Sequence, residues 1–403
     1  MTRLHYFCSA LICTMLGVTM INAPLALAQS KGESVRPEVG KPLQAARDLM
    51  KSQRNKEALV KISEADAVGN KTAYETFLIQ QMRGSAAAAA GDLDTAIKAF
   101  EAAIASGRLG PSEQLRMVQA VGTMHYRAKD YSKAATWISR YLKEGGNDAQ
   151  MRTLLVQSYY LSNDCASVSR LVQGEERRRP SEEELQIMQS CFLKQKDNNG
   201  YLAALEKLVT YYPKKEYWTE LVNRMQRKRG FSERLSLDVM RLKRATGNLN
   251  SAGDYMEMTQ LALQAGLAGE AKNIVEEGFA AGVLGSGPQA DRHTRLRDLV
   301  NKTLADDKPG AGDAEATAAK DGSALVNIGF SYVANGQSAK GIALMEQGIR
   351  KGAMKRPEDA KLHLGIAYLL ANQKAKAIQT FKSVQGTEGT ADLARLWILH
   401  SSR

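Results

Sequence analysis

The sequence predicts an all-α protein built from stacked pairs of antiparallel helices, and three observations support this. A small or aliphatic residue recurs at intervals of about 35 residues and opens the second of two helical patterns. Segments 103–109, 278–284 and 348–354 align without gaps, and each contains a glycine that can end a helix. Proline is scarce, with 9 in 403 residues. The recurring residues are Ala58, Ala96, Ala134, Val168, Ala204, Leu235, Ala271, Gly341 and Ala377.

Residues 1–28 indicate an export signal. Arg3 supplies a basic end, residues 11–18 carry most of the apolar run, and Ala26, Leu27 and Ala28 form a small-x-small cleavage pattern. An uncleaved anchor is the alternative, although the apolar run is short for a membrane span of about 20 residues. We therefore expect a signal peptide over residues 1–28 and a disordered leader over residues 29–38.

The last repeat unit shows the pattern most clearly. Counted from Pro357, its characteristic residues lie at offsets of 7, 8, 11, 20, 24 and 27. These residues are Leu364, Gly365, Tyr368, Ala377, Phe381 and Val384. The preceding unit places Ile328, Gly329, Tyr332, Gly341, Met345 and Gly348 at the same offsets. Small residues at two of these offsets allow two antiparallel helices to approach closely, and the large residues fill the gaps beside them.

In these positions the chain resembles the tetratricopeptide repeat family. The resemblance implies a right-handed solenoid of about ten antiparallel helical hairpins with a C-terminal closing helix, expected at residues 391–400. The gap from Ala271 to Gly341 is two periods long and holds a degenerate unit. We expect an N-terminal array over residues 39–305, a linker over residues 306–322, and a C-terminal pair of hairpins with the closing helix over residues 323–403.

The charge of the chain limits the class of partner. The formal net charge is +12, and it is +11 once residues 1–28, with one Arg and no acidic residue, are removed. Export makes nucleic acid an improbable partner, whereas acidic proteins and anionic envelope surfaces remain. No later segment is long and apolar enough to cross a membrane, so we expect a soluble periplasmic or secreted protein after cleavage.

Basic residues concentrate in one part of the chain and provide the candidate partner-binding site. Residues 214–244 contain ten basic and four acidic side chains, and Tyr and Trp lie among them. Arg with Tyr and Trp is the mixture enriched at protein interfaces, but a solvated helix face above core aromatic residues is the alternative. The candidate binding residues are Arg177, Arg178, Arg179, Lys214, Lys215, Arg224, Arg227, Lys228 and Arg229.

Two cysteines follow the export signal, Cys165 and Cys191. The repeat register places them on neighbouring antiparallel helices, and disulfides persist in exported proteins. The pair is a candidate disulfide, with two independently buried thiols as the alternative.

No arrangement of residues in the sequence indicates catalysis, a metal site or a cofactor. His5, His125, His293, His363 and His400 are scattered without the spacing of metal ligands. We therefore expect no enzyme activity, no cofactor and no small-molecule substrate. The predicted function is an interaction scaffold in the cell envelope that binds a peptide or a partner protein on the concave surface of the solenoid.

Two further hypotheses concern the role of the protein in the cell envelope. The chain as a whole, and especially segment 212–218, Tyr-Pro-Lys-Lys-Glu-Tyr-Trp, is similar to periplasmic tetratricopeptide proteins found beside TonB-type energy-transduction systems. That resemblance implies a role in support of outer-membrane transport. The alternative function is an envelope-surface protein that uses the Arg-rich face to bind lipid phosphate or the carboxylates of glycans.

Overall fold

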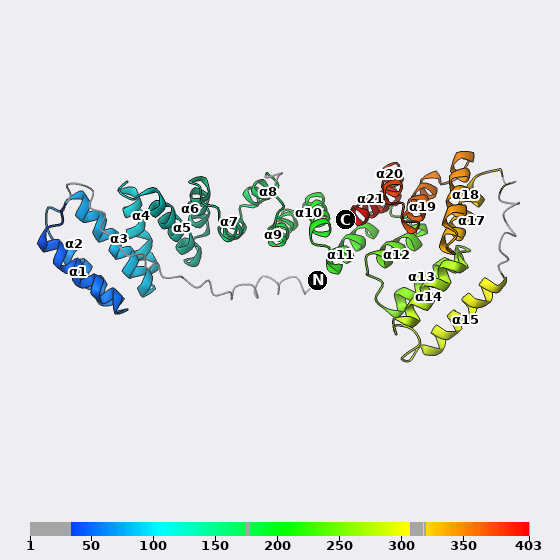
Figure 1. Ribbon diagram of the computed structural model, residues 1–403, viewed down its shortest axis with the longest axis horizontal. Helices are drawn as coiled ribbons and strands as arrows, with labels where there is room; N and C mark the ends of the chain where they lie inside the picture. Colours follow the sequence, from blue (N-terminus) through cyan, green and yellow to red (C-terminus); the bar gives the residue numbers. More distant parts are fainter. Residues whose placement is uncertain (1–33, 175–177, 307–316, 318–319, 403) are drawn as a thin grey trace. The chain divides into compact units, whose positions relative to one another are not determined.

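The computed structural model of the chain describes residues 34–174, 178–306, 317 and 320–402. In these ranges the chain forms twenty α-helices and one 3-10 helix, and it contains no strand (Figure 1). The chain divides into two compact units, residues 1–148 (unit 1) and 149–403 (unit 2). A cluster of buried apolar side chains lies in each. The predicted signal peptide, residues 1–28, lies outside the described ranges.

Unit 1 consists of three helical hairpins. Its helices are α1 (Pro37–Lys51), α2 (Asn55–Asp66), α3 (Ala73–Ala90), α4 (Leu93–Ala105), α5 (Pro111–Arg127) and α6 (Tyr131–Lys143). Short polar side chains begin several of them: Thr72 and Glu75 form a capping box at α3, and Asp92 caps α4. Gly91 ends α3 in the left-handed conformation with φ of 81°. Residues 29–33 of the predicted leader lie outside the described ranges, and α1 begins at Pro37, inside the span predicted as leader.

Small residues set the distance between the two helices of a hairpin. A Cβ atom on Gly84 of α3 would lie 2.5 Å from the ring of Phe100 on α4. A Cβ atom on Gly122 of α5 would lie 2.8 Å from Ile138 on α6. Both distances are inside van der Waals contact, so a larger residue at either position would force the facing side chain or the helix to move. Close approach of the two helices thus explains why small residues recur in the sequence of each hairpin.

Unit 2 begins with four further hairpins. Their elements are α7 (Ala149–Leu161), α8 (Cys165–Gln173), α9 (Glu182–Lys194), α10 (Asn198–Tyr211), α11 (Lys215–Gln226), η1 (Glu233–Leu235), α12 (Ser236–Ala245), α13 (Ala252–Gln264) and α14 (Ala268–Ala280). The shortest interval in the sequence pattern, which ends at Leu235, has a local cause. Leu235 lies in the 3-10 helix η1 and not inside α12, so it precedes the second helix of its hairpin.

The rest of unit 2 contains α15 (Ala290–Asp306), α17 (Ser323–Ala334), α18 (Ser338–Lys351), α19 (Pro357–Leu370), α20 (Lys374–Lys382) and α21 (Thr390–Ser401). Helix α15 fills the degenerate interval and packs on α13 and α14. The predicted closing helix is present as α21, and the predicted solenoid of helical hairpins is confirmed. Most of the predicted linker, residues 306–322, lies outside the described ranges.

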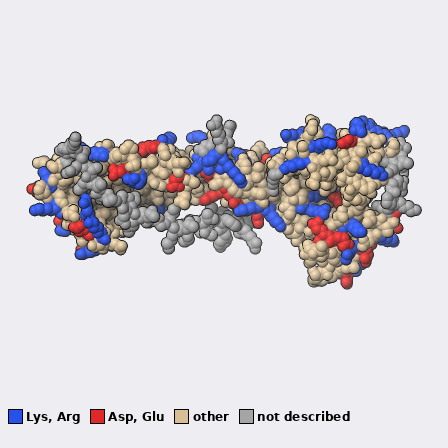
Figure 2. Space-filling view, in the orientation of Figure 1, with Lys and Arg blue, Asp and Glu red and all other residues tan. Residues whose placement is uncertain are grey.

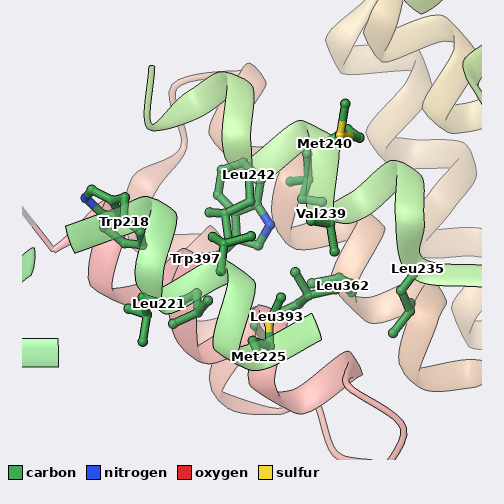
Figure 3. Close-up of a cluster of buried hydrophobic side chains, with 14 of the residues drawn as sticks. Trp218, Leu221, Met225, Leu235, Val239, Met240, Leu242, Leu362, Leu393 and Trp397 are labelled. Atoms are coloured by element: carbon green, nitrogen blue, oxygen red, sulfur yellow. The ribbon is translucent and has the colours of Figure 1, made fainter. Parts of the chain in front are cut away.

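The C-terminal helices pack against the middle of unit 2. Helix α21 contacts α19 and α20, which precede it, and also α10 and α12, which lie far from it in the sequence. Figure 3 shows Trp397 and Leu393 of α21 beside Trp218 and Leu221 of α11. The ring of Trp397 stacks on Phe381 at a centroid distance of 6.1 Å. Unit 2 is therefore held together by contacts between its C-terminal and middle helices, and the division of the chain falls at residues 148 and 149, which the repeat pattern does not predict.

Candidate partner-binding surfaces

The first helices of several successive hairpins contact one another within each unit. Helix α1 contacts α3 in unit 1, and α7 contacts α9 and α17 contacts α19 in unit 2. Each of these helices also packs on the second helix of its own hairpin. Close contact among first helices is the arrangement that gives a solenoid its inner surface. This layer is the first candidate surface.

Polar side chains connect neighbouring first helices in unit 2. Gln186 on α9 donates a hydrogen bond to the hydroxyl of Tyr217 on α11 at 2.6 Å. The same hydroxyl donates to Glu182 at the start of α9. Burial and this hydrogen bond raise the pKa of Tyr217 above its usual range. Thr219 of α11 donates to Asn248, in the loop before α13, at 3.1 Å. The layer is thus lined by hydroxyl and amide groups that already have partners.

The predicted arginines at residues 177–179 have different surroundings. Arg177 lies outside the described residues. Arg178 forms an ion pair with Glu184, a buried carboxylate that also accepts a hydrogen bond from Arg152 at 2.9 Å. Glu184 completes the capping box of α9, so Arg178 has a structural contact at the start of that helix.

Arg179 is exposed and lies over aromatic rings. Its guanidinium carbon is 4.6 Å from the ring centre of Tyr212 and 5.0 Å from that of Tyr211. The hydroxyl of Tyr212 donates to the carbonyl of Pro180 at 2.9 Å, which holds the ring in place. Cation–π contact accounts for this placement and leaves the outer face of the guanidinium open to solvent.

Three of the candidate residues on α11 or directly beside its ends are paired with carboxylates. Lys214 lies 2.6 Å from Glu182, and Arg224 lies 2.5 Å from Glu220 and over the ring of Tyr201. Lys228 lies 2.9 Å from Asp392 of α21. Pairing of this kind reduces the charge that these residues can offer to a partner.

The other three, Lys215, Arg227 and Arg229, are exposed and have no carboxylate within ion-pair distance among the described residues. Trp218 lies among the basic positions in sequence, but its side chain is in the core, with 1% of its surface exposed. The structure thus brings the basic residues of segment 214–229 to several different surroundings and not to one uniform patch.

A buried charge network at α12 was not predicted from the sequence. Arg241 donates two hydrogen bonds to Glu270 of α14, at 2.8 and 2.6 Å, and one to Asp238 at 2.7 Å. His363 of α19 lies 3.1 Å from the other oxygen of Asp238. Burial by itself raises the pKa of Asp238, but His363 and Arg241 outweigh it and lower the pKa to about 2. The i,i+3 spacing of Asp238 and Arg241 was the available sequence signal, but neither Glu270 nor His363 could be assigned to it.

Cys165 and Cys191 are joined by a disulfide, with an S–S distance of 2.20 Å and a Cα–Cα distance of 5.4 Å. The bond links the first turn of α8 to the last turn of α9, and both side chains are buried. It therefore fixes the boundary between two successive hairpins of unit 2.

Two absences hold for the described part of the chain. No group of three or more His, Cys, Asp or Glu side chains has the geometry to hold a metal ion. Of the helices in the described ranges, none combines the length and the apolar character that a membrane span requires.

Comparison with known proteins gave matches to repeat proteins. A family model described as tetratricopeptide repeat matches residues 82–149 and 327–391. Curated protein sequences gave no match. Among solved structures, the TPR protein YrrB, described as having an unusual peptide-binding site, shares 13% identity, with 44% of this chain and 89% of that chain covered and a TM-score of 0.30.

Two further solved structures are similar over a larger share of the chain. A tetratricopeptide repeat protein from Parabacteroides merdae shares 12% identity over 80% of this chain and 98% of that chain, with a TM-score of 0.27. Yeast Tom70 shares 11% identity over 90% of this chain and 95% of that chain, with a TM-score of 0.26. The family match runs from the second half of α3 through α6 in unit 1 and from α17 through α20 in unit 2, and it includes the closely packed Gly84, Gly122 and Gly365. The chain therefore carries tetratricopeptide repeats at residues 82–149 and 327–391.

Proposed function

We propose that this chain is a non-enzymatic scaffold that binds a peptide or an extended segment of a partner protein on the concave surface of its solenoid. A tetratricopeptide-repeat solenoid is a scaffold for protein–protein interaction, and the finer assignment to a concave groove is our proposal. The observation that carries it is the direct contact between first helices, as between α7 and α9 and between α17 and α19. Such a layer offers successive binding positions along an extended chain.

The polar character of this layer supports an extended ligand. Gln81 on α3 and Gln189 on α9 occupy equivalent positions, because each lies the same number of residues before its marker, Ala96 or Ala204. Both side chains are partly exposed. An amide can both donate to and accept from a peptide backbone, whose groups need partners once they leave water.

We also propose that the scaffold works in the periplasm, in support of TonB-type outer-membrane transport. Two features support export: the signal-like residues 1–28, and the pairing of Cys165 with Cys191 in a form that persists in oxidising compartments. The TonB connection rests on the resemblance of the chain, and of segment 212–218 in particular, to periplasmic proteins of that kind.

Site-specific photo-crosslinking in the native envelope tests the groove. A photoreactive residue replaces Gln81 or Gln189 on first helices, and matched variants carry it at Lys98 of α4 or Lys207 of α10 on second helices. We expect a defined protein adduct from the first-helix positions and none from the second-helix positions, because only the former line the proposed groove. Adducts from second-helix positions alone, or adducts with lipid or glycan alone, would refute the proposal.

A further inference from the structure

Most of the basic residues that the sequence groups together are neutralised within the fold. In residues 214–244, seven of ten basic side chains form ion pairs with carboxylates. The carboxylate partners come from several helices, including Asp392 of α21 and Asp359 of α19. The charge that remains available in this segment is confined to Lys215, Arg227 and Arg229.

The C-terminal hairpins carry a second excess of positive charge. Residues 323–384 contain nine basic and three acidic side chains. Each of the acidic side chains is already paired: Glu346 with Arg350 at 3.8 Å, Glu358 with Lys361 at 2.7 Å, and Asp359 with Arg234 of η1 at 3.1 Å. Figure 2 shows Lys and Arg outnumbering Asp and Glu over the part of unit 2 formed by α18, α19 and α20.

The fold joins these two basic segments at one edge of unit 2. Arg234, which follows the loop after α11, pairs with Asp359 in the first turn of α19 and with Glu388 in the loop before α21. The backbone N–H of Ser232 donates to the carbonyl of Glu388 at 3.0 Å. The backbone N–H of Gln385, just after α20, donates to Glu358 of α19 at 2.6 Å. The loop after α11, the start of α19 and the end of α20 therefore lie together.

We define the basic edge as the exposed cations on these adjoining segments that lack a carboxylate within ion-pair distance among the described residues. They are Arg227 and Arg229 after α11, Lys355 and Arg356 before α19, and Lys382 at the end of α20. The exposed carboxylates beside them are Glu388, which is 64% exposed and already pairs with Arg234, and Glu233 at the start of η1. Five exposed cations thus lie on these adjoining segments against two exposed carboxylates, Glu233 and Glu388, so the edge keeps an excess of positive charge.

We propose that the basic edge binds an acidic segment of a partner protein, in addition to any ligand in the groove; this rests on the scaffold function proposed above. Three of the five cations are arginines, whose planar guanidinium groups bind carboxylates through paired hydrogen bonds. The partner segment is rich in Asp and Glu and follows the row of cations from one loop to the next.

A bilayer is a poorer fit to the same surface than a protein segment is. Proteins that bind membranes through basic residues usually add apolar side chains that enter the lipid. The large apolar side chains exposed in the described residues are Val60, Leu161, Leu193, Leu299 and Leu370, and none belongs to the segments that form the basic edge. Glu388 and Asp392 also lie on the loop and helix beside the edge, and their carboxylates repel a uniform anionic surface more than a segment of mixed sequence.

The test compares three forms of the full chain: the natural protein, an edge variant and a charge-matched control. The edge variant is Arg227→Gln, Arg229→Gln, Lys355→Gln, Arg356→Gln and Lys382→Gln. The control variant neutralises five exposed cations elsewhere: Lys196→Gln, Lys272→Gln, Arg292→Gln, Arg295→Gln and Lys302→Gln. Both lose five charges, so long-range attraction falls equally in the two.

Fluorescence anisotropy measures the binding of a labelled peptide of ten residues that alternates Glu and Ser, with Gln in place of Glu in the neutral probe. We expect the natural chain and the control to bind the acidic probe, the edge variant to bind it about tenfold more weakly or worse, and the neutral probe to bind to none. The affinity for the acidic probe should fall as salt is raised through about 0.15 M. Circular dichroism checks the helix content of each form, and the loop variant Lys355→Gln with Arg356→Gln replaces the full edge variant if that one unfolds.

Each other result overturns the basic edge as an acidic-peptide site. Equal binding by edge and control variants would show that net charge alone is responsible, and absence of binding to the natural chain would remove the site. Edge-dependent binding to vesicles with anionic lipid, without peptide binding, would assign the edge to membranes. Crosslinking at Gln81 and Gln189 does not depend on any of these outcomes. A negative result for the basic edge would therefore not refute the proposed groove.

Discussion

Glycine at one offset of the repeat acts through backbone contact in the C-terminal hairpin. A Cβ atom at Gly329 of α17 would lie 2.6 Å from the carbonyl oxygen of Gly341 and 2.9 Å from the backbone nitrogen of Met345 on α18. Backbone atoms cannot rotate away as a side chain can, so the two helices would have to separate. The requirement for glycine is therefore strongest where the backbones of two helices are in direct contact.

We expect Gly329→Ala to lower the free energy of unfolding of unit 2 by about 1 to 3 kcal/mol through overpacking. Gly253→Ala on α13 is the matched control, because the nearest atom to its Cβ would be 3.6 Å away, and alanine favours helix by up to about 1 kcal/mol. Urea denaturation followed by circular dichroism measures both. Equal effects of the two substitutions would contradict the proposed close contact.

The buried cation Arg241 neutralises two buried carboxylates, Asp238 and Glu270. Arg241→Met should cost about 3 to 5 kcal/mol of stability, because it leaves carboxylates in the core without their partner. The control is Arg244→Met on the same helix, whose pair with Glu277 is about one third exposed and is worth about 0 to 1 kcal/mol. Thermal unfolding of the two variants measures the difference, and similar losses would refute a special role for the buried network.

At the scale of a helix, the start of α3 depends on a charged hydrogen bond to the segment before α1. Arg36 donates to Glu75, a fully buried carboxylate that also caps α3, and lowers the pKa of Glu75 to about 2. A carboxylate whose pKa falls on folding adds stability above its unfolded pKa and loses that contribution as the pH drops toward the folded pKa.

The stability of unit 1 should therefore decrease between about pH 4.5 and pH 2, in step with protonation of Glu75. In Glu75→Gln the dependence in this range should be weaker, since no charge is lost at that position. Denaturant titrations across this pH range on the two proteins measure it. An identical pH dependence in both would mean that other carboxylates control acid unfolding.

The disulfide is an element-scale constraint, because it joins helices of two successive hairpins. Its loop spans a sequence separation of 26, and closing a loop of that size lowers the entropy of the unfolded chain. We expect a reducing agent to lower the stability of unit 2 by about 2 to 4 kcal/mol. The variant with Cys165→Ala and Cys191→Ala should start at the lower value and not respond to reductant; a response in that variant would point to another cause.

For the whole molecule, the informative feature is the contact of α21 with α10 and α12. In a linear repeat array each unit contacts only its neighbours, so damage at one end stays local. Here the C-terminal helix forms contacts across the sequence, and Lys228 to Asp392 and Arg395 to Glu206 are ion pairs across the same boundary. Unit 2 should therefore unfold as one cooperative body.

Trp397→Ala tests this cooperativity. The side chain is 4% exposed, and its removal should destabilise unit 2 by about 3 to 5 kcal/mol. Hydrogen exchange should then accelerate in α10, α11 and α12, about 150 to 200 residues away in sequence, and remain unchanged in α1 to α6. Faster exchange confined to α19 to α21 would show a linear array instead.

The repeat pattern predicted the class of fold, the hairpins and the closing helix because each depends on residues close together in the sequence. Gly84, Gly122 and Gly365 identify helix contacts within one hairpin, and those contacts are local. The pattern was misleading at Leu235, where a 3-10 turn displaces the second helix. It was silent on α15, whose unit lacks the recurring residues.

The surroundings of the candidate binding residues could not be predicted from the sequence. Counting charges in residues 214–244 could not reveal that Lys228 pairs with Asp392 or Arg234 with Asp359. The partners lie 125 residues or more away, and their pairing depends on how α19 and α21 pack on the middle of unit 2. Local charge density therefore overstated the available charge there and missed Lys355, Arg356 and Lys382.

The amino-acid sequence by itself determined the helices and their pairing, because helix periodicity and the need for small residues at close contacts act within about 35 residues. The tertiary structure alone decided that the C-terminal hairpins pack against α10 to α12, which cations are neutralised, and which remain exposed on one edge. The physical reason is that ion pairing and apolar burial between distant segments depend on their positions in space, and these follow from the packing of the whole unit.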